Sequence, residues 1–181
     1  MKNSVYIATS LDRFIADKAG RIDWLETVPN PDQVDMGYSA FISTIEAIVM
    51  GRNTYEKVLS FGIEWPYEKP VFVLSTTLSG VPTELHGRVQ FLKGNLRSIL
   101  DEIHSQGYKN LYIDGGNIIQ QFLKEDLIDE MIITTIPVLL GDGVPLFGTL
   151  NLPLKFRCEQ SKVYLDAIAQ NHFVRDRSLD E

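Results

Sequence analysis

Apolar runs and amphipathic stretches alternate along most of the chain. The runs are short, rich in β-branched residues and bounded by glycine, proline or charged residues, and this pattern predicts buried strands. We expect strands at 4–10, 47–51, 70–77, 109–114 and 129–141. Between them, apolar residues recur every three or four positions, which predicts helices at 38–45, 53–59, 95–107 and 118–123.

The order of these elements predicts an α/β fold. Three apolar strands, at 47–51, 70–77 and 109–114, are each followed by a helix, which favours parallel neighbours joined by right-handed crossovers. From 154 to 175 the chain alternates in two runs broken near Asp166, which predicts a terminal antiparallel hairpin. A length of 181 residues suits one domain, so we expect 1–181 to form a single unit.

Charge and composition narrow the function classes. The net charge is −7 and no run is rich in lysine or arginine, so the footprint of a nucleic-acid-binding protein is missing. The single cysteine, Cys158, excludes an internal disulfide framework and fits a reducing compartment. The apolar stretch near the start is too short for a signal peptide, and none approaches the roughly 18 residues that span a bilayer. We therefore expect a cytoplasmic protein that binds neither membranes nor nucleic acid.

Polar groups follow three of the predicted strands, and in open α/β sheets ligands bind beyond the carboxyl ends of the strands. These groups offer one guanidinium, several hydroxyls and two helix N-termini, and Asn53 or Thr54 lies near the cap of one of these helices. Such a combination suits a nucleotide with several phosphates. Each segment also has a plainer interpretation as a surface salt bridge, a set of caps or a tight turn. The segments are Gly51-Arg52-Asn53-Thr54, Ser75-Thr76-Thr77 and Asp114-Gly115-Gly116-Asn117.

Signatures of other sites are missing. The chain has no G-x-x-x-x-G-K-[ST] motif, and "DGGN" lacks the third glycine of G-x-G-x-x-G. Three scattered histidines and one cysteine form no metal-binding pattern, so no metal is expected. No histidine stands in the context of a serine triad.

Over nearly its full length, the chain resembles the dihydrofolate reductase-like superfamily. The matching stretches are "IATSLD", "IDWL", "IVMGRNTYE", "VFVLSTT", "LYIDGGNIIQQFL" and "IPVLLGDGVPLF". "SLD", "DGG" and "PVLLGDGVPLF" look more like the riboflavin-biosynthesis reductase branch (the RibD C-terminal domain), including its small stand-alone bacterial relatives, whereas "VMGRNTYE" resembles dihydrofolate reductase at least as well. The resemblance implies a three-layer α/β/α fold with a mostly parallel central sheet and a C-terminal antiparallel hairpin.

The resemblance also implies NADPH as the hydride donor. In the family, the arginine and threonine after "MG" and the hydroxyls after the next strand hold the 2′-phosphate and nearby phosphates, and the glycine turn carries the pyrophosphate. The end of the first strand meets the nicotinamide amide through its backbone. For the 2′-phosphate and nearby phosphates, the matching positions here are Arg52, Thr54, Ser75 and Thr76. For the pyrophosphate they are Gly115, Gly116, Asn117 and Ile118, and for the nicotinamide amide they are Ala8 and Thr9.

Two aspartates are candidates for the substrate side. Asp35 precedes "MGR" by a spacing similar to that of the acid that binds the pterin in dihydrofolate reductase, and it is equally a natural helix N-cap. Asp114 matches an acidic substrate contact of the riboflavin branch, with a bond to its own turn as the alternative. Asp12 is expected to order the loop after the first strand. Trp24 packs either in the core, the safer interpretation, or over the nicotinamide pocket.

Three functions stay open at this point. The resemblance implies an NADPH-dependent reductase of a small heterocycle, 5-amino-6-(5-phosphoribosylamino)uracil. The second possible function is reduction of dihydrofolate instead. The stretch 56–69 lacks the aspartate–proline pair and the arginine that hold the ribose phosphate in the riboflavin branch. The third function is NADPH binding without turnover, which a cleft filled by Trp24, Tyr38 or Phe41 would favour. A homodimer is expected, because exposed apolar strands such as 131–140 and the hairpin can pair across a two-fold axis.

Overall fold

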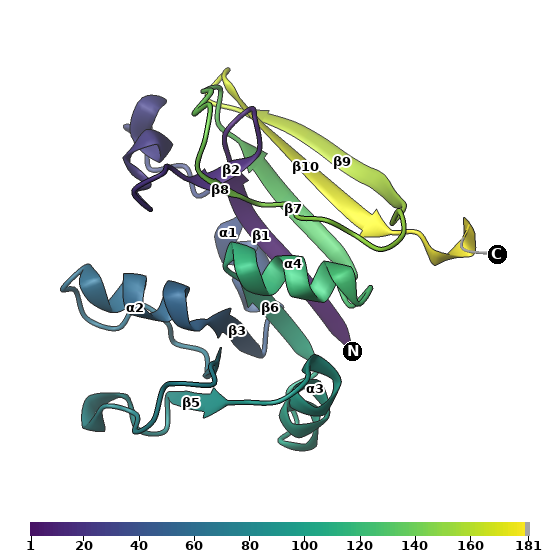
Figure 1. Ribbon diagram of the computed structural model, residues 1–181. Helices are drawn as coiled ribbons and strands as arrows, with labels where there is room; N and C mark the ends of the chain where they lie inside the picture. Colours follow the sequence, from purple (N-terminus) through teal and green to yellow (C-terminus); the bar gives the residue numbers. More distant parts are fainter. Residues whose placement is uncertain (180–181) are drawn as a thin grey trace.

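The computed structural model describes residues 1–179, in which eight strands form one sheet (Figure 1). The sheet order is β5-β4-β3-β6-β1-β7-β10-β9; neighbours from β5 to β7 are parallel, whereas β10 and β9 are antiparallel. The expected α/β sheet with a terminal hairpin is therefore confirmed. The strands are β1 (Lys2–Thr9), β3 (Ala47–Gly51), β4 (Val71–Leu74), β5 (Val89–Leu92), β6 (Asn110–Asp114), β7 (Glu130–Thr135), β9 (Phe156–Tyr164) and β10 (Ile168–Arg175).

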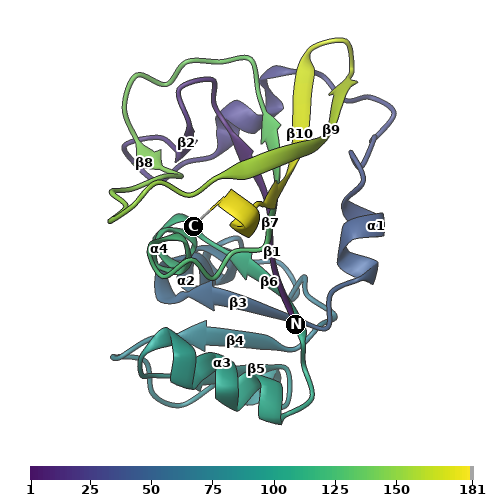
Figure 2. The same cartoon turned by 90° about the vertical axis from the view of Figure 1, so that its right-hand side faces the viewer.

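Helices cover both faces of the sheet, and side chains alternate between these faces along each strand. In β3, Ala47 and Val49 pack with α3 and α4, whereas Ile48 and Met50 pack with α1 and α2. Figure 2 shows α1 and α4 on opposite sides of the strands, which makes three layers. None of the helices in residues 1–179 is long and apolar enough to cross a membrane. The helices are α1 (Tyr38–Ser43), α2 (Arg52–Ser60), α3 (Leu96–Ser105) and α4 (Gly116–Lys124), with short 3-10 turns η1 (Asp23–Thr27), η2 (Thr83–Leu85) and η3 (Arg177–Leu179).

Two local expectations about helix starts have different outcomes. Asn95 caps α3 as predicted, since its side-chain oxygen accepts a hydrogen bond from the Ser98 N–H at 2.9 Å. The prediction for α2 was wrong, because this helix begins one residue earlier and its N-cap is Gly51, with no side-chain hydrogen bond to the first turn. The sequence analysis also missed β5 and a separate two-stranded sheet of β2 (Phe14–Ala16) and β8 (Val144–Pro145).

The stretch 131–140 is not an exposed strand, which corrects the expected route to a dimer. Its first half, residues 131–135, belongs to β7, which pairs with β1 on one side and with β10 on the other. Its apolar character reflects burial within the sheet. The edge of the sheet is instead β9, whose Val163 side chain is 70% exposed. The homodimer stays a prediction, and of the two segments only the hairpin remains available for it.

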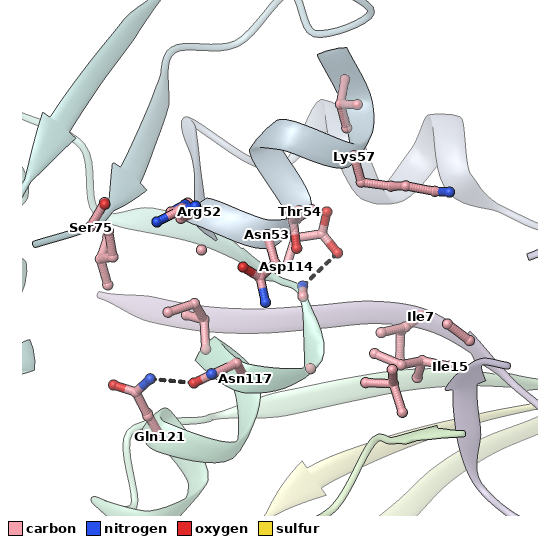
Figure 3. Close-up of a pocket in the computed structure, with 18 of the residues that line it drawn as sticks. Ile7, Ile15, Arg52, Asn53, Thr54, Lys57, Ser75, Asp114, Asn117 and Gln121 are labelled. Atoms are coloured by element: carbon pink, nitrogen blue, oxygen red, sulfur yellow. Dashed lines mark hydrogen bonds between the residues drawn. The ribbon is translucent and has the colours of Figure 1, made fainter. Parts of the chain in front are cut away.

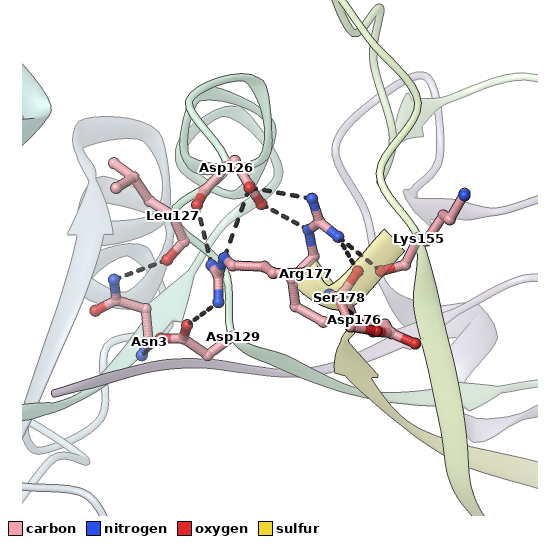
Figure 4. Close-up of polar contacts among 9 residues, drawn as sticks. Asn3, Asp126, Leu127, Asp129, Lys155, Asp176, Arg177 and Ser178 are labelled. Atoms are coloured by element: carbon pink, nitrogen blue, oxygen red, sulfur yellow. Dashed lines mark hydrogen bonds and ion pairs between the residues drawn. The ribbon is translucent and has the colours of Figure 1, made fainter. Parts of the chain in front are cut away.

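Charged contacts fasten the end of β10 to the turn between α4 and β7 (Figure 4). Arg175 is buried, and its guanidinium donates to both carboxylate oxygens of Asp126 at 2.7 and 3.1 Å. Arg177 donates to Asp129 at 2.9 Å, and Asp129 also accepts from the backbone N–H of Asn3 at 2.8 Å. These bonds tie the C-terminal hairpin to β1 and β7, although β1 is far from the other two in the sequence. The hairpin is therefore an integral edge of the sheet.

Candidate functional site

A cleft of about 810 Å³ lies beyond the carboxyl ends of β1, β3, β4 and β6, where ligand sites of open α/β sheets occur (Figure 3). This volume falls in the range of small-molecule and cofactor pockets. The three polar segments predicted from the sequence all line it, although they lie up to 66 positions apart in the chain. The predicted residues among its lining are Ala8, Gly51, Arg52, Asn53, Thr54, Ser75, Thr76, Thr77, Asp114, Gly115, Gly116, Asn117 and Ile118.

Glycines bring the starts of α2 and α4 together at the centre of the cleft. Gly115 has a left-handed φ of +89°, and a Cβ there would collide with the hydroxyl of Thr54 in α2. A Cβ on Gly51 would lie 2.9 Å from Cγ1 of Ile118 in α4. Neither helix has a side-chain cap, so the first backbone N–H groups of both are left for other acceptors. The pair of helix starts forms a cradle that suits an anion.

Hydroxyls and cations gather at one side of this cradle, beyond β3 and β4. Arg52 donates to Thr77 Oγ1 at 2.9 Å and pairs with Glu56 at 2.8 Å. Ser75 Oγ accepts from the N–H of Thr77 at 3.2 Å. The plainer interpretations of these residues, a salt bridge and a turn, are thus present, yet the same side chains line the cleft. Lys93 adds a second cation to the lining; it follows β5, the strand that the sequence analysis missed.

Among residues 1–179, Asp114 is the one acidic residue in the lining of the cleft. It ends β6, and its Oδ1 accepts from the N–H of Gly115 at 2.8 Å, which is the local turn bond expected for it. Burial raises the pKa of Asp114 to about 6, and the smaller effects of the Gly115 N–H and Tyr112 act in the opposite direction. A carboxyl group that titrates near neutral pH inside a cleft is a candidate for proton transfer.

Tyrosines surround Asp114 and are affected by its charge. The pKa of Tyr67 is raised, first by burial and then by the charge of Asp114, and the pKa of Tyr38 is raised for the same two reasons. Tyr112 is buried and donates to the backbone oxygen of Tyr6 at 2.9 Å. These phenols stay protonated at neutral pH, so Tyr38 and Tyr67 can act as hydrogen-bond donors but not as bases, whereas the one O–H of Tyr112 already donates to Tyr6.

The end of β1 contributes Ala8 to the cleft, whereas Thr9 lies outside its lining. Thr9 is fully buried, and its carbonyl accepts from the N–H of Ile136 at 2.8 Å, on the side of β7. Neighbouring residues of a strand direct their backbone groups to opposite sides. Ala8 therefore directs its own N–H and C=O to the other side, beyond the last β1–β6 pair, Ser4–Tyr112.

Asp35, the other substrate candidate, does not line the cleft. It is exposed, and its carboxylate accepts from the N–H groups of Gly37 at 2.9 Å and Ser39 at 3.0 Å. These bonds fix the start of α1, although the N-cap of this helix is Gly37 and not Asp35. The Ser39 hydroxyl, together with these N–H groups, holds the pKa of Asp35 below its ordinary value.

Asp12 and Trp24 take the structural roles that the sequence indicated. Asp12 accepts from the Ser10 hydroxyl at 2.6 Å and from the N–H of Gly141 at 2.7 Å, so it ties the loop after β1 to the loop after β7. Trp24 is buried against Ile136 and Ile168 and does not line the cleft. Tyr38 and Phe41 are also missing from the lining, so none of the three aromatic residues fills the cleft.

The residues on the side of the cleft away from Arg52 were not predicted from the sequence. One signal was available there, because Lys57, Val58 and Phe61 follow Asn53 and Thr54 at helical spacing and so share their face of α2. The β2–β8 sheet and Tyr67 had no comparable signal. The missed residues of this side are Ile7, Ile15, Ile22, Leu25, Lys57, Val58, Phe61, Tyr67 and Val144.

Comparisons with known proteins agree with the fold. Residues 4–169 match the family described as the RibD C-terminal domain. The Bacillus subtilis protein YwjB, which is uncharacterised, is 38% identical over 176 residues, which cover 96% of this chain and 98% of YwjB. A crystal structure from Shewanella sp. PV-4, provisionally described as a riboflavin biosynthesis protein, superposes with a TM-score of 0.95 at 53% identity, covering 98% of this chain and all of that one.

More distant structures share the fold. A Thermotoga maritima diaminohydroxyphosphoribosylaminopyrimidine deaminase/5-amino-6-(5-phosphoribosylamino)uracil reductase superposes with a TM-score of 0.74 at 16% identity, covering 97% of this chain and 56% of that chain. Dihydrofolate reductase from Enterococcus faecalis, solved with NADP(H), has a TM-score of 0.64 at 14% identity, covering 97% and 96% of the two chains. The expected dihydrofolate reductase-like fold is therefore confirmed.

Proposed function

The chain belongs to the RibD C-terminal domain family, and from this premise we propose that it is an NADPH-dependent reductase of a small heterocyclic substrate. One observation carries the proposal: the ends of four parallel strands gather a phosphate-binding set and a protonatable carboxyl group, Asp114, in a single cleft of about 810 Å³. A binding module without turnover would use Asp114 only for its turn bond to the Gly115 N–H. The absence of Trp24, Tyr38 and Phe41 from the lining leaves room for a substrate.

The donors in the cleft fit the phosphates of NADPH. Arg52, Lys93 and the hydroxyls of Ser75 and Thr77 would hold the 2′-phosphate, because cations and hydroxyls together give charge-assisted and neutral hydrogen bonds. The starts of α2 and α4 would hold the diphosphate through backbone N–H groups, which the missing Cβ of Gly115 leaves accessible. Ala8 would bond the nicotinamide amide through its outward-facing backbone.

When bound, NADPH would supply a hydride to a C=N or C=O carbon of the substrate. The chain's own contribution is positioning, exclusion of water and proton supply. Apolar side chains of the cleft, such as Ile7 and Leu25, exclude water from the reacting atoms. Asp114, with its pKa raised to about 6, holds a proton at mildly acidic pH and can donate it to the atom on which negative charge develops.

The position of Asp35 favours the pyrimidine over dihydrofolate as the substrate. The dihydrofolate hypothesis needs Asp35 at the pterin, but its carboxylate is exposed and occupied at the start of α1. The pyrimidine hypothesis needs only Asp114, which lies in the cleft. We therefore propose 5-amino-6-(5-phosphoribosylamino)uracil, or a close analogue, as the substrate.

A fluorescence titration with NADPH and NADH tests the cofactor. We expect the native protein to prefer NADPH, and Arg52→Ala to lose roughly tenfold or more in NADPH affinity with a much smaller loss for NADH, since only NADPH carries the 2′-phosphate. Arg97→Ala is the matched control, because Arg97 is exposed on α3 and does not line the cleft. Equal losses for both nucleotides would remove Arg52 from this role. Adding the pyrimidine or dihydrofolate to the NADPH complex and following absorbance then tests turnover.

A further inference from the structure

The cleft contains another cation, which lies away from Arg52 and the strand-end hydroxyls. Lys57 lies in the second turn of α2, four residues after Asn53, and both line the cleft. Figure 3 shows its side chain extending toward the side where Ile7 and Ile15 lie, whereas Arg52 and Ser75 lie on the opposite side. The cleft therefore presents positive charge at two separate places.

Lys57 differs from Arg52 in its partners. Arg52 is held by Glu56 and Thr77. Lys57 makes no ion pair within residues 1–179, and its ammonium group lies 5.6 Å from the centre of the Phe61 ring. A ring beside the stem limits the freedom of this long side chain without neutralising its charge. Its ammonium group can therefore meet an anion in the cleft without first breaking an ion pair.

Lys57 is exposed, and its surroundings in the cleft would strengthen its attraction for an anion once a bound ligand displaces water. The side chains that line this part of the cleft are mostly apolar, with the Tyr67 hydroxyl as a further donor, and they come from β1, the β2–β8 sheet and the loop after α2. Coulomb attraction grows as water is displaced from such surroundings. The chain has a net charge of −7, yet no acidic side chain within residues 1–179 pairs with Lys57. Its positive charge therefore favours anions in this part of the cleft.

We propose that Lys57 binds an anionic substituent of the substrate, a phosphate or a carboxylate, and so selects acidic substrates. The inference rests on the proposed function, because it assigns the phosphates of NADPH to the other side of the cleft. Lys57 is a specificity-determining residue here; the proton and the hydride are supplied elsewhere. Tyr67 would donate a second hydrogen bond to the same anion.

The test uses the full chain saturated with NADPH, so that the cofactor's phosphates occupy the Arg52 side. Two anionic fragments are titrated calorimetrically: ribose 5-phosphate, and p-aminobenzoylglutamate as the carboxylate probe. We expect one of them to bind, and Lys57→Gln to weaken it about tenfold or more, the range for a lost hydrogen bond to a charged group. Lys124→Gln on α4 is the matched control, because Lys124 is exposed and outside the cleft. The fragment that binds names the source of the anion.

The outcomes separate this inference from the proposed function. If NADPH itself does not bind, the proposed function fails and the inference fails with it. If NADPH binds but neither fragment does, or if Lys57→Gln binds the fragment as well as Lys124→Gln does, only the role of Lys57 is overturned. NADPH affinity, measured for each variant, verifies that the cleft has kept its shape.

Discussion

Replacing Asp114 with asparagine should stabilise the protein at alkaline pH while impairing its reaction. The substitution keeps the shape of the side chain and an oxygen that can accept from the Gly115 N–H. It removes a negative charge that is costly in the cleft, since burial raises the pKa of Asp114 from 3.8 to about 6. This difference corresponds to about 3 kcal/mol, at 1.36 kcal/mol for each pKa unit.

The sign of the effect follows from proton binding. Between pH about 4 and about 6, the folded protein holds a proton on Asp114 that the unfolded chain has lost, so native stability falls as the pH rises through this window. An asparagine has no such dependence. The variant should therefore match the native protein near pH 4 and exceed it at about pH 8 by up to about 3 kcal/mol.

Urea unfolding at both pH values measures this difference directly. In thermal unfolding, the variant should melt roughly 6–12 °C higher at alkaline pH, since 1 kcal/mol shifts the Tm of a domain of this size by roughly 2–4 °C. Turnover of the native enzyme should decline as the pH rises above about 6, because a proton donor must be protonated. A stability difference that is the same at both pH values, or a variant less stable at alkaline pH, would refute the reasoning.

Two further predictions concern a glycine turn and a helix cap. Gly115→Ala should lower both stability and NADPH affinity, because it combines the cost of a left-handed φ, about 1–2 kcal/mol, with a collision at Thr54. Gly107→Ala is its control, since Gly107 also has a left-handed φ but an added Cβ would meet open space. Equal losses of stability and of NADPH affinity in the two variants, measured by urea unfolding and NADPH titration, would exclude the collision. Asn95→Ala should cost about 1 kcal/mol of unfolding free energy by removing the cap of α3, and unchanged urea unfolding would contradict this.

The sequence predicts the centre of the sheet better than its edges. Strand β3 was predicted with its observed bounds, because its run of apolar residues is buried on both faces. Strand β5 has only four residues, of which Gln90 and Phe91 are partly exposed, so its pattern is too short to identify. The same physical rule explains the error at 131–140, where apolar residues indicated an exposed strand but the first half of the stretch belongs to β7, in the interior of the sheet.

The two sides of the cleft differ in how directly the sequence encodes them. On the side where we propose that the nucleotide binds, the polar groups follow from where strands end and helices begin, so local patterns around Gly51 and Gly115 were enough to predict their place in the cleft. On the other side, the lining comes from the second turn of α2, the loop containing Tyr67 and the β2–β8 sheet, which only tertiary packing brings together. The backbone of the fold fixes the first side, whereas side chains alone fix the second. Chains that share this fold can therefore keep a nucleotide site and differ in substrate, and residues such as Lys57 are where that difference is expected to lie.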